Sequence, residues 1–336
     1  MARMTFPWLV PDDPESLASL QRNAGLITHV SPTWYRMTGD LNVASRMTPD
    51  VAALARERGI AIHPLIVNEG FDADIAHRIL ATPESRRRAA EIIAALVFDG
   101  DYDGINMDFE GTFGRSRDNY TDLLRRLGEL LRPRGKWLTV DVVSQTRPVG
   151  EYPVDGSWAS PFDYAALGEI CDRVMLMGYD YSMAEPGPVT PHWWLEYVID
   201  WALKQMPAAR IVVGLPFYAR HWVISDEGIS PPYGLKQDES IQFVAKSGRQ
   251  AEYLPRDGTY RAVWSDGAGE HHVYYDNAET LEAKMNLVAK KGIEGVAFWR
   301  LGQESADVWK AVAGFLGEGA GQAAEARAVA SGRRQE

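Results

Sequence analysis

The fold of this chain can be inferred from one stretch of its sequence, Asp103-Gly104-Ile105-Asn106-Met107-Asp108-Phe109-Glu110. Apolar and polar residues alternate along it, and successive side chains of a β-strand point to opposite faces. The apolar side chains would therefore share one face, and the other face would carry three polar side chains: Asn106, Asp108 and Glu110. In a closed barrel the apolar set would pack against surrounding helices, and the polar set would line the interior and rise toward the carboxyl end of the strand, where barrel enzymes carry their sites.

Short apolar runs of this kind alternate with longer amphipathic segments along most of the chain, which is typical of βα units and a parallel sheet. We predict strands at Met4–Val10, Leu26–Met37, Ile60–Asn68, Gly104–Glu110, Trp137–Ser144, Arg173–Tyr179, Ile211–Tyr218 and Gly295–Leu301. We predict helices that begin near Asp13, Thr48 and Thr82, and further helices at Asp118–Leu131, Asp163–Ile170, Trp193–Met206, Ala278–Lys291 and Ala306–Leu316. Eight such units predict an α/β fold, a (β/α)8 TIM barrel.

The regular alternation is interrupted between the seventh and eighth predicted strands. Residues 223–275 contain aromatic-rich pieces that favour short antiparallel strands, so we predict a small α+β insertion there. The barrel as a whole should occupy residues 1–316. Residues 317–336 have almost no large apolar side chain, and this composition predicts a disordered tail.

The composition narrows the class of ligand. The chain has 336 residues, with 35 lysines and arginines against 46 acidic residues and a formal charge of -11. A net negative surface repels phosphate backbones and anionic membranes, so we expect neither nucleic acid nor membrane as a partner. The chain has one cysteine, Cys171, and no His/Cys metal spacing, which predicts that it binds no metal. The sequence does not specify an oligomeric state.

Two neighbouring carboxyl groups inside a barrel suggest catalysis. Burying an unpaired carboxylate costs several kcal/mol, and such a group responds by a shift of its pKa. Asp108 would lie one pleat below Glu110, and like charges at that separation raise one pKa, which keeps a glutamic acid protonated near neutral pH. The alternative to catalysis is that Asp108 and Glu110 are simply the polar, solvated end of a strand.

At this point the chain resembles the family 18 glycoside hydrolases, the chitinase-like barrels. The segment Asp103–Glu110 is similar to the family's Asp-Gly-x-Asp-x-Asp-x-Glu signature. Three further segments resemble family strands in the same order: Met177-Gly178-Tyr179-Asp180, Gly214–Arg220 and Gly295–Trp299. The resemblance covers roughly residues 4–316. It is nearest to the bacterial branch that includes spore-wall N-acetylglucosaminidases, because of Asn106 and of Ser31-Pro32-Thr33-Trp34-Tyr35.

The resemblance implies a retaining hydrolase of β-1,4-linked N-acetylglucosamine polymers, peptidoglycan or chitin, in which the substrate's own acetamido oxygen is the nucleophile. It implies that the reaction needs no metal or organic cofactor. It implies that Glu110 is the catalytic acid, that Asp108 orients the acetamide and that Tyr179 hydrogen-bonds the acetamide oxygen. Further side chains are then expected to bind substrate: Asn106, Asp180, Trp299, Tyr218 and Trp34. Trp299 would stack on a sugar ring, whereas Trp34 could equally pack under a loop.

Asn106 departs from the family pattern, in which an aspartate commonly occupies this position. An amide cannot take up a proton, so we expect an altered pH profile with activity retained. Polar residues at the ends of the third strand and along the fifth strand could also touch the sugar: Asn68, Glu69, Asp141, Ser144 and Gln145.

Two other functions remain open from the sequence. One is a sugar-binding, lectin-like barrel without hydrolysis, although that function usually accompanies loss of the acid, and Glu110 is present. The other is a hydrolase that uses two carboxylates directly, with Asp180 as the nucleophile. The first fifteen residues predict no signal peptide, which favours a cytoplasmic protein, whereas the resemblance favours a cell wall or spore location.

Overall fold

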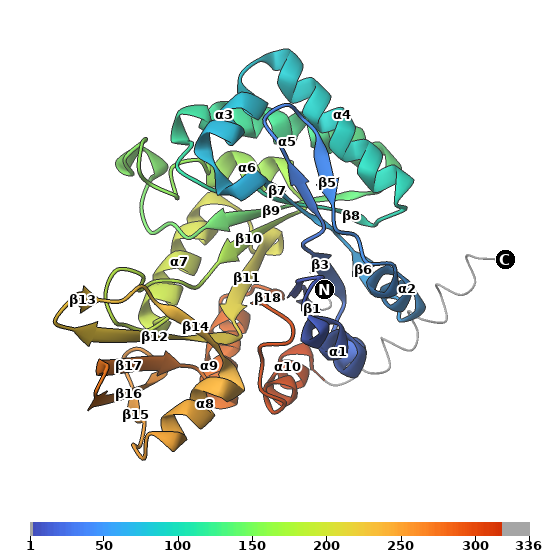
Figure 1. Cartoon of the computed structure of the whole chain (residues 1–336). Coiled ribbons are helices and arrows are strands. Elements are labelled where there is room, and N and C mark those ends of the chain that lie inside the picture. Colours follow the sequence, from blue (N-terminus) through green and yellow to red (C-terminus); the bar gives the residue numbers. More distant parts are fainter. Residues whose placement is uncertain (1–2, 318–336) are drawn as a thin grey trace.

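The computed structural model describes residues 3–317, and its main element is a closed barrel of parallel strands surrounded by helices (Figure 1). The barrel strands, in chain order, are β1 (Met4–Thr5) with β2 (Trp8–Leu9), β3 (His29–Pro32) with β4 (Tyr35–Met37), β6 (Ala61–Ile62) with β7 (Leu65–Asn68), β8 (Gly104–Asp108), β9 (Trp137–Val143), β10 (Arg173–Met177), β11 (Ile211–Pro216) and β18 (Gly295–Trp299). The barrel closes because β1 pairs in parallel with β18 and β2 pairs in parallel with β3. The predicted (β/α)8 barrel is confirmed.

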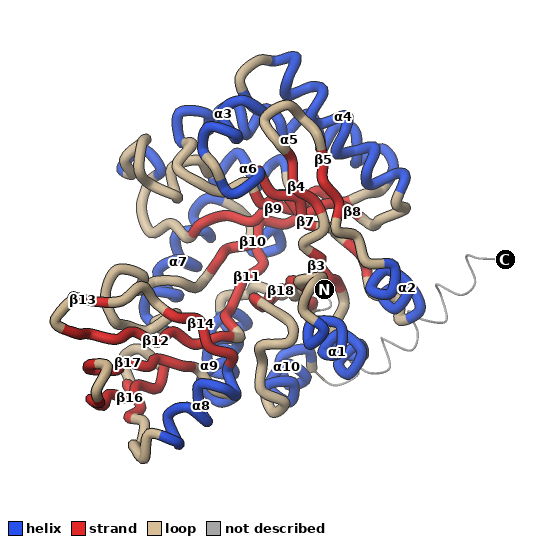
Figure 2. Tube along the Cα trace, in the orientation of Figure 1, coloured by secondary structure: helices blue, strands red, loops and turns tan. Residues whose placement is uncertain are grey.

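Helices cover the outside of the barrel, as Figure 2 shows. They are α1 (Pro14–Asn23), α2 (Pro49–Glu57), α4 (Pro83–Asp99), α5 (Arg117–Leu131), α6 (Tyr164–Ile170), α7 (His192–Gln205), α9 (Ala278–Lys290) and α10 (Val308–Leu316). Proline in the first turn and a capping side chain explain several of these starts, because proline has no N–H that needs a partner and a capping side chain accepts from an exposed amide group. Thr82 accepts from the Ser85 amide and Asp13 from the Glu15 amide, whereas Thr48 occupies the cap position without such a bond.

The alternation that defined β8 has the expected consequence for packing. Ile105, Met107 and Phe109 are fully buried in the main hydrophobic core, together with helix residues such as Ile93 of α4 and Leu124 of α5. The polar side chains of the same strand therefore face the barrel interior. β8 itself ends at Asp108, so Glu110 lies in the loop that follows the strand and not on the strand.

The predicted α+β insertion connects β11 to α9. It consists of β12 (Tyr218–Ser225), β13 (Gly228–Ile229), β14 (Tyr233–Lys236), α8 (Gln237–Lys246), β15 (Glu252–Leu254), β16 (Thr259–Asp266) and β17 (Gly269–Tyr275). Its strands pair antiparallel and form a sheet beside the barrel (Figure 1). It starts at Tyr218 and not at 223, because the long strand β12 follows β11 almost directly.

Two further elements have no counterpart in the sequence prediction. The strand β5 (Val43–Ser45) forms a hairpin with β4, and the helix α3 (Ala73–Leu80) lies between β7 and α4. Both belong to loops that extend from the carboxyl ends of barrel strands. The predicted disordered tail lies outside the described residues, apart from Gly317.

Candidate active site

The loop after β8 holds Glu110 in a fixed backbone position. Asn68, at the end of the neighbouring strand β7, accepts from the Glu110 amide at 2.9 Å and donates to the Glu110 carbonyl at 2.9 Å. The chain then turns sharply at Gly111, which has a φ of 123°. A Cβ atom at this position would lie 2.7 Å from the Phe71 carbonyl oxygen, so only glycine fits both the conformation and the space. Asn68 was a possible sugar contact from sequence; its side chain instead fixes the Glu110 backbone.

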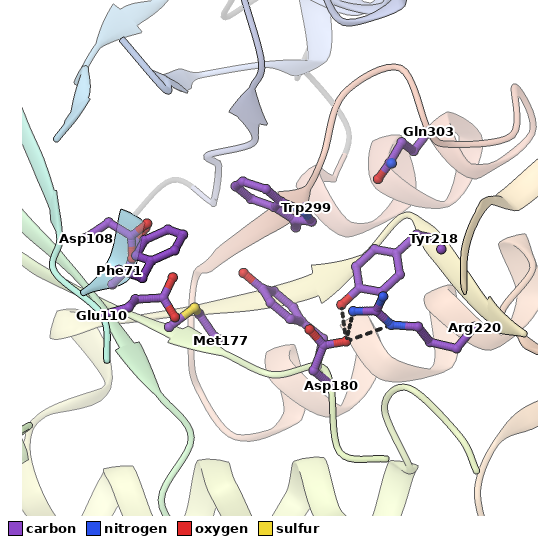
Figure 3. A pocket seen from close by; sticks show the side chains of 12 residues that line it. Phe71, Asp108, Glu110, Met177, Asp180, Tyr218, Arg220, Trp299 and Gln303 are labelled. Atoms are coloured by element: carbon purple, nitrogen blue, oxygen red, sulfur yellow. Dashed lines mark hydrogen bonds and ion pairs between the residues drawn. The ribbon is translucent and has the colours of Figure 1, made fainter. Parts of the chain in front are cut away.

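A cavity of about 340 Å³ opens at the carboxyl ends of the barrel strands, where barrel enzymes bind their substrates. Its walls are formed by Phe71, Asp108, Glu110, Asp141, Met177, Tyr179, Asp180, Tyr218, Arg220, Gly234, Trp299 and Gln303. Figure 3 shows Asp108, Glu110 and Phe71 on one side of the cavity and the cluster of Asp180, Tyr218 and Arg220 on the other. The cavity is therefore acidic on one wall and contains a charge pair on the opposite wall.

Burial determines the protonation of the two carboxyl groups on the acidic wall. Burial raises the pKa of Glu110 to about 7, with a further increase from the negative charge of Asp180, while the interaction with Asp108 opposes the rise. Burial raises the pKa of Asp108 well above its ordinary range, and the charges of Glu110 and Asp141 raise it further. The Oδ1 atom of Asp108 is buried and has no hydrogen-bond partner. Near neutral pH, Glu110 can thus donate a proton and Asp108 retains an unused hydrogen-bonding atom.

Asn106 lies below the cavity and does not line it. Its side-chain amide donates to both carboxylate oxygens of Asp141 at 3.0 Å and to Ser31 Oγ at 3.1 Å. Its own oxygen accepts from the Thr139 hydroxyl at 2.8 Å. Asn106 is fully buried and both of its side-chain polar atoms are hydrogen-bonded, so its side chain holds the Asp141 carboxylate in place. The predicted role of Asn106 as a direct substrate ligand is not supported by this geometry.

The opposite wall is a bonded cluster centred on one oxygen of Asp180. Tyr218 donates its hydroxyl to Asp180 Oδ1 at 2.7 Å, and Arg220 donates to the same atom at 2.7 Å from Nη2 and at 3.2 Å from Nε. The Arg220 guanidinium also lies over the Tyr218 ring. Asp180 has a φ of 58°, a conformation that aspartate tolerates better than most residues. The side chain is thereby held at the cavity edge by a cation and a hydroxyl.

Aromatic rings form the floor of the cavity. Trp299, at the end of β18, packs on Trp8 at 5.9 Å between ring centroids, and Trp8 contacts the edge of Tyr179 at 6.3 Å. Tyr179 in turn contacts Tyr218 at 6.1 Å. Trp299 is half-buried, so part of its ring remains available to a ligand. An exposed aromatic face of this kind is a suitable surface for the apolar side of a sugar ring.

Most of the residues predicted from sequence meet in this cavity. Six of them line it: Asp108, Glu110, Tyr179, Asp180, Tyr218 and Trp299. Trp34 does not, and its predicted role is corrected here. It is 1% exposed, its ring packs on Tyr102 and its indole nitrogen donates to Thr48 Oγ1 at 3.0 Å. The chain turns between β3 and β4, which directs Trp34 into the core next to α2 and away from the cavity.

Other lining residues were not predicted as site residues. Phe71 ends a single 3-10 turn and Gln303 lies in a loop, and in such short or irregular segments sequence periodicity gives no direction for a side chain. Arg220 lies in the quoted seventh-strand segment, but its pairing with Asp180 depends on the insertion. Asp141 is the most informative case, since the sequence suggested only that it could touch the sugar. The signal available in the sequence was an acidic residue in the middle of the mostly apolar run Trp137–Val143.

Within residues 3–317, no group of three or more His, Cys, Asp or Glu side chains is arranged to hold a metal ion. In the same part of the chain, no helix combines the length and the apolar character needed to cross a lipid bilayer.

Known proteins share this fold and parts of this sequence. Residues 15–304 match the model of glycosyl hydrolases family 18. The cortical fragment-lytic enzyme of Bacillus subtilis (strain 168) is 27% identical over 249 residues, which cover 72% of this chain and 56% of that protein. The chain thus spans little more than half the length of this relative.

Two solved structures illustrate the likeness in three dimensions. The chitinase from Chromobacterium violaceum ATCC 12472 has a TM-score of 0.86 and 26% identity, and the match covers 94% of this chain and all of that one (100%). The Bacillus cereus spore cortex-lytic enzyme SleL has a TM-score of 0.83 at 21% identity, over 93% of this chain and 74% of that one, which shows a shared fold. The family match extends over most of the chain, from the first barrel helix to the loop beyond Trp299. This chain belongs to glycosyl hydrolases family 18.

Proposed function

We propose that this chain hydrolyses polymers of β-1,4-linked N-acetylglucosamine and that Glu110 is its catalytic acid. The observation that carries the proposal is the pair of carboxyl groups on the acidic wall of the cavity. Glu110 has a pKa of about 7, and Asp108, which also lines the cavity, has a buried oxygen with no hydrogen-bond partner. A general acid works best when its pKa lies near the working pH, and Glu110 meets this condition.

The reaction uses the substrate's own acetamido group. Glu110 donates its proton to the glycosidic oxygen, the acetamido oxygen attacks the anomeric carbon, and the glycosidic bond breaks with release of the leaving sugar. The product of this step is a cyclic oxazolinium ion. Water then attacks the same carbon from the face that the leaving group vacated, and the Glu110 carboxylate accepts a proton from that water. Both displacements invert the carbon, so the overall result is retention.

The remaining lining residues hold the sugar. Asp108 Oδ1 accepts the acetamido N–H and, once ionised, balances the positive charge of the oxazolinium. The Tyr179 hydroxyl donates to the acetamido oxygen, and Trp299 stacks on the ring. Asp180 and Tyr218 close the polar wall. Asp180 is less suited to be a direct nucleophile, because its charge is paired with Arg220 and its Oδ1 accepts bonds from Tyr218 and Arg220.

Bacterial cell-wall or spore-wall peptidoglycan is the first substrate we propose, and chitin is the second. Relatives named for spore cortex lysis and a relative named as a chitinase both match this chain. A location at the wall or spore follows from the same substrate. The formal charge of -11 suits a ligand that is not a polyanion.

Product analysis by mass spectrometry tests the proposal. The protein and its Glu110→Gln variant are incubated with N-acetylglucosamine oligomers and, separately, with peptidoglycan. Cleavage by the parent protein and not by the variant supports the proposal, and the substrate that is cleaved identifies the polymer. Intact substrates with both proteins, together with retained binding, would replace the hydrolase by a lectin-like barrel.

A further inference from the structure

Asp141 and Asp108 occupy neighbouring positions on adjacent barrel strands. Asn106 pairs with Thr139 and Met107 with Val140 in the parallel register of β8 and β9. The next position along both strands brings Asp108 beside Asp141, on strands about 4.8 Å apart. Both side chains line the cavity, and they are 5% and 2% exposed, respectively. Two buried carboxyl groups therefore face the same space.

The hydrogen bonds of these two groups are unequal. Asp141 accepts bonds from the Asn106 amide on both oxygens and from the Trp8 indole nitrogen at 2.9 Å on Oδ2. The Thr139 hydroxyl fixes the Asn106 side chain with its amide nitrogen toward Asp141. Asp108 Oδ1, in contrast, has no partner. Donors stabilise an ionised carboxylate, so this arrangement favours a negative charge on Asp141 and a proton on Asp108.

The surroundings of Asp141 make it unfavourable for Asp108 and Asp141 to be ionised at the same time. Of the described residues, the titratable groups that interact with its charge are Asp108 on β8, Glu110 in the following loop, Tyr179 after β10 and Tyr120 on α5. All are acids. The guanidinium that lines the cavity, that of Arg220, is bonded to Asp180. Because uncompensated buried charges are costly, the two aspartates together hold a proton.

We propose that Asp141 stores the proton that Asp108 must give up when substrate binds, in place of an acid at position 106. The proposal rests on the hydrolysis proposed above. In the free enzyme Asp108 is protonated and Asp141 ionised. When the acetamido N–H reaches Asp108 Oδ1, the Asp108 O–H bond breaks and the proton bonds to an Asp141 oxygen. The charge of the pair stays at one negative unit throughout, and the proton returns after product release.

Asp141 thereby acts as a positioning residue, through Asp108 and without a bond to the reacting atoms. The amide of Asn106 cannot accept a proton from Asp108 at neutral pH. Its two donor bonds instead hold the Asp141 carboxylate in place beside Asp108. Asn106 and Asp141 thus form one unit, in which the Asn106 amide orients the Asp141 carboxylate and this carboxylate accepts the proton.

The test compares three variants with the parent protein: Asp141→Asn, Asn106→Asp and the exchange Asn106→Asp/Asp141→Asn. The first readout is the carboxyl ¹³C NMR titration of aspartate-labelled protein, with Asp108→Asn used to assign the Asp108 signal. The second is the pH dependence of kcat and KM on N-acetylglucosamine oligomers. Thermal unfolding of each variant verifies that it is folded.

In the parent protein, Asp108 and Asp141 should titrate in two shared steps. In Asp141→Asn, Asp108 should titrate at lower pH and no longer share a step with position 141, because a neighbouring negative charge is gone. We expect kcat to fall on the order of tenfold to a hundredfold with little change in KM. The exchange variant should recover most of kcat and the shared titration, since it returns one acid to the unit.

Three results would overturn the proposal. The first is an unchanged Asp108 titration in Asp141→Asn, and the second is an exchange variant that is no more active than Asp141→Asn. The third applies if Asp141→Asn does not fold: it is an unaltered Asp141 titration in Asn106→Asp, the variant that adds an acid to the unit. If the parent protein cleaves no glycan, the proposed function fails. The titrations still decide whether Asp108 and Asp141 share a proton, because they require no turnover.

Discussion

Replacing Glu110 by glutamine should stabilise the protein above neutral pH while it removes hydrolysis. Burial raises the pKa of Glu110 to about 7 from an ordinary value of 4.5. The folded protein therefore binds this proton more tightly than the unfolded chain does. The stabilising contribution is complete below pH 4.5 and is lost as the pH rises through about 7. At about 1.36 kcal/mol per pKa unit, the loss amounts to about 3 kcal/mol.

Glutamine has nearly the same shape as glutamic acid but does not ionise, so the free energy of unfolding of the variant should not fall in this way as the pH rises. We expect the free energies of unfolding of the two proteins to be similar near pH 4.5 and to differ by about 3 kcal/mol at pH 8, with the variant more stable. Because Asp108 interacts with Glu110, the midpoint of the pH dependence belongs to the pair.

Urea denaturation at several pH values between 4.5 and 8.5, followed by tryptophan fluorescence, measures the difference. Glu129→Gln is a matched control, because Glu129 lies exposed on α5 and its replacement should leave the pH dependence unchanged. A difference between parent and Glu110→Gln that does not vary with pH would refute the reasoning, since the pKa of Glu110 would then be the same in the folded and unfolded states.

Three further substitutions and one ligand test follow from the site. Asn68→Ala should lower kcat about tenfold and the free energy of unfolding by about 2 kcal/mol, because the Glu110 amide loses a buried partner; steady-state kinetics and urea denaturation check both. Trp299→Ala should raise KM about tenfold or more with a smaller effect on kcat, as a stacking surface worth about 1.5–3 kcal/mol is removed; unchanged KM would exclude a contact with the sugar. Arg220→Leu leaves the Asp180 carboxylate without its cation and should lower the free energy of unfolding by about 1–3 kcal/mol in calorimetry or urea titration. EDTA should leave the rate unchanged, because the reacting groups proposed are those of the protein and the sugar; inhibition reversed by added metal would contradict this.

Local patterns in the sequence were sufficient to predict the barrel, its insertion and the polar face of β8. These depend on local periodicity and on turn residues, which act over a few positions. Alternation along residues 103–110 was enough to place Asp108 and Glu110 on an interior face. The predicted strand ends two residues too late, because β8 ends at Asp108 and Asn68 holds the Glu110 backbone in the following loop.

Which of the polar side chains meet depends on contacts between segments that are far apart in the chain. Asp141 lies 35 residues from Asn106, and their contact depends on the register between β8 and β9. Asn68 reaches the Glu110 backbone from another strand, 42 residues away. Trp34 turned into the core because the packing of Tyr102 and α2 determines its orientation. Periodicity specifies the face of a side chain, whereas register and packing between distant segments specify its partners, and the chemistry of this cavity depends on those partners.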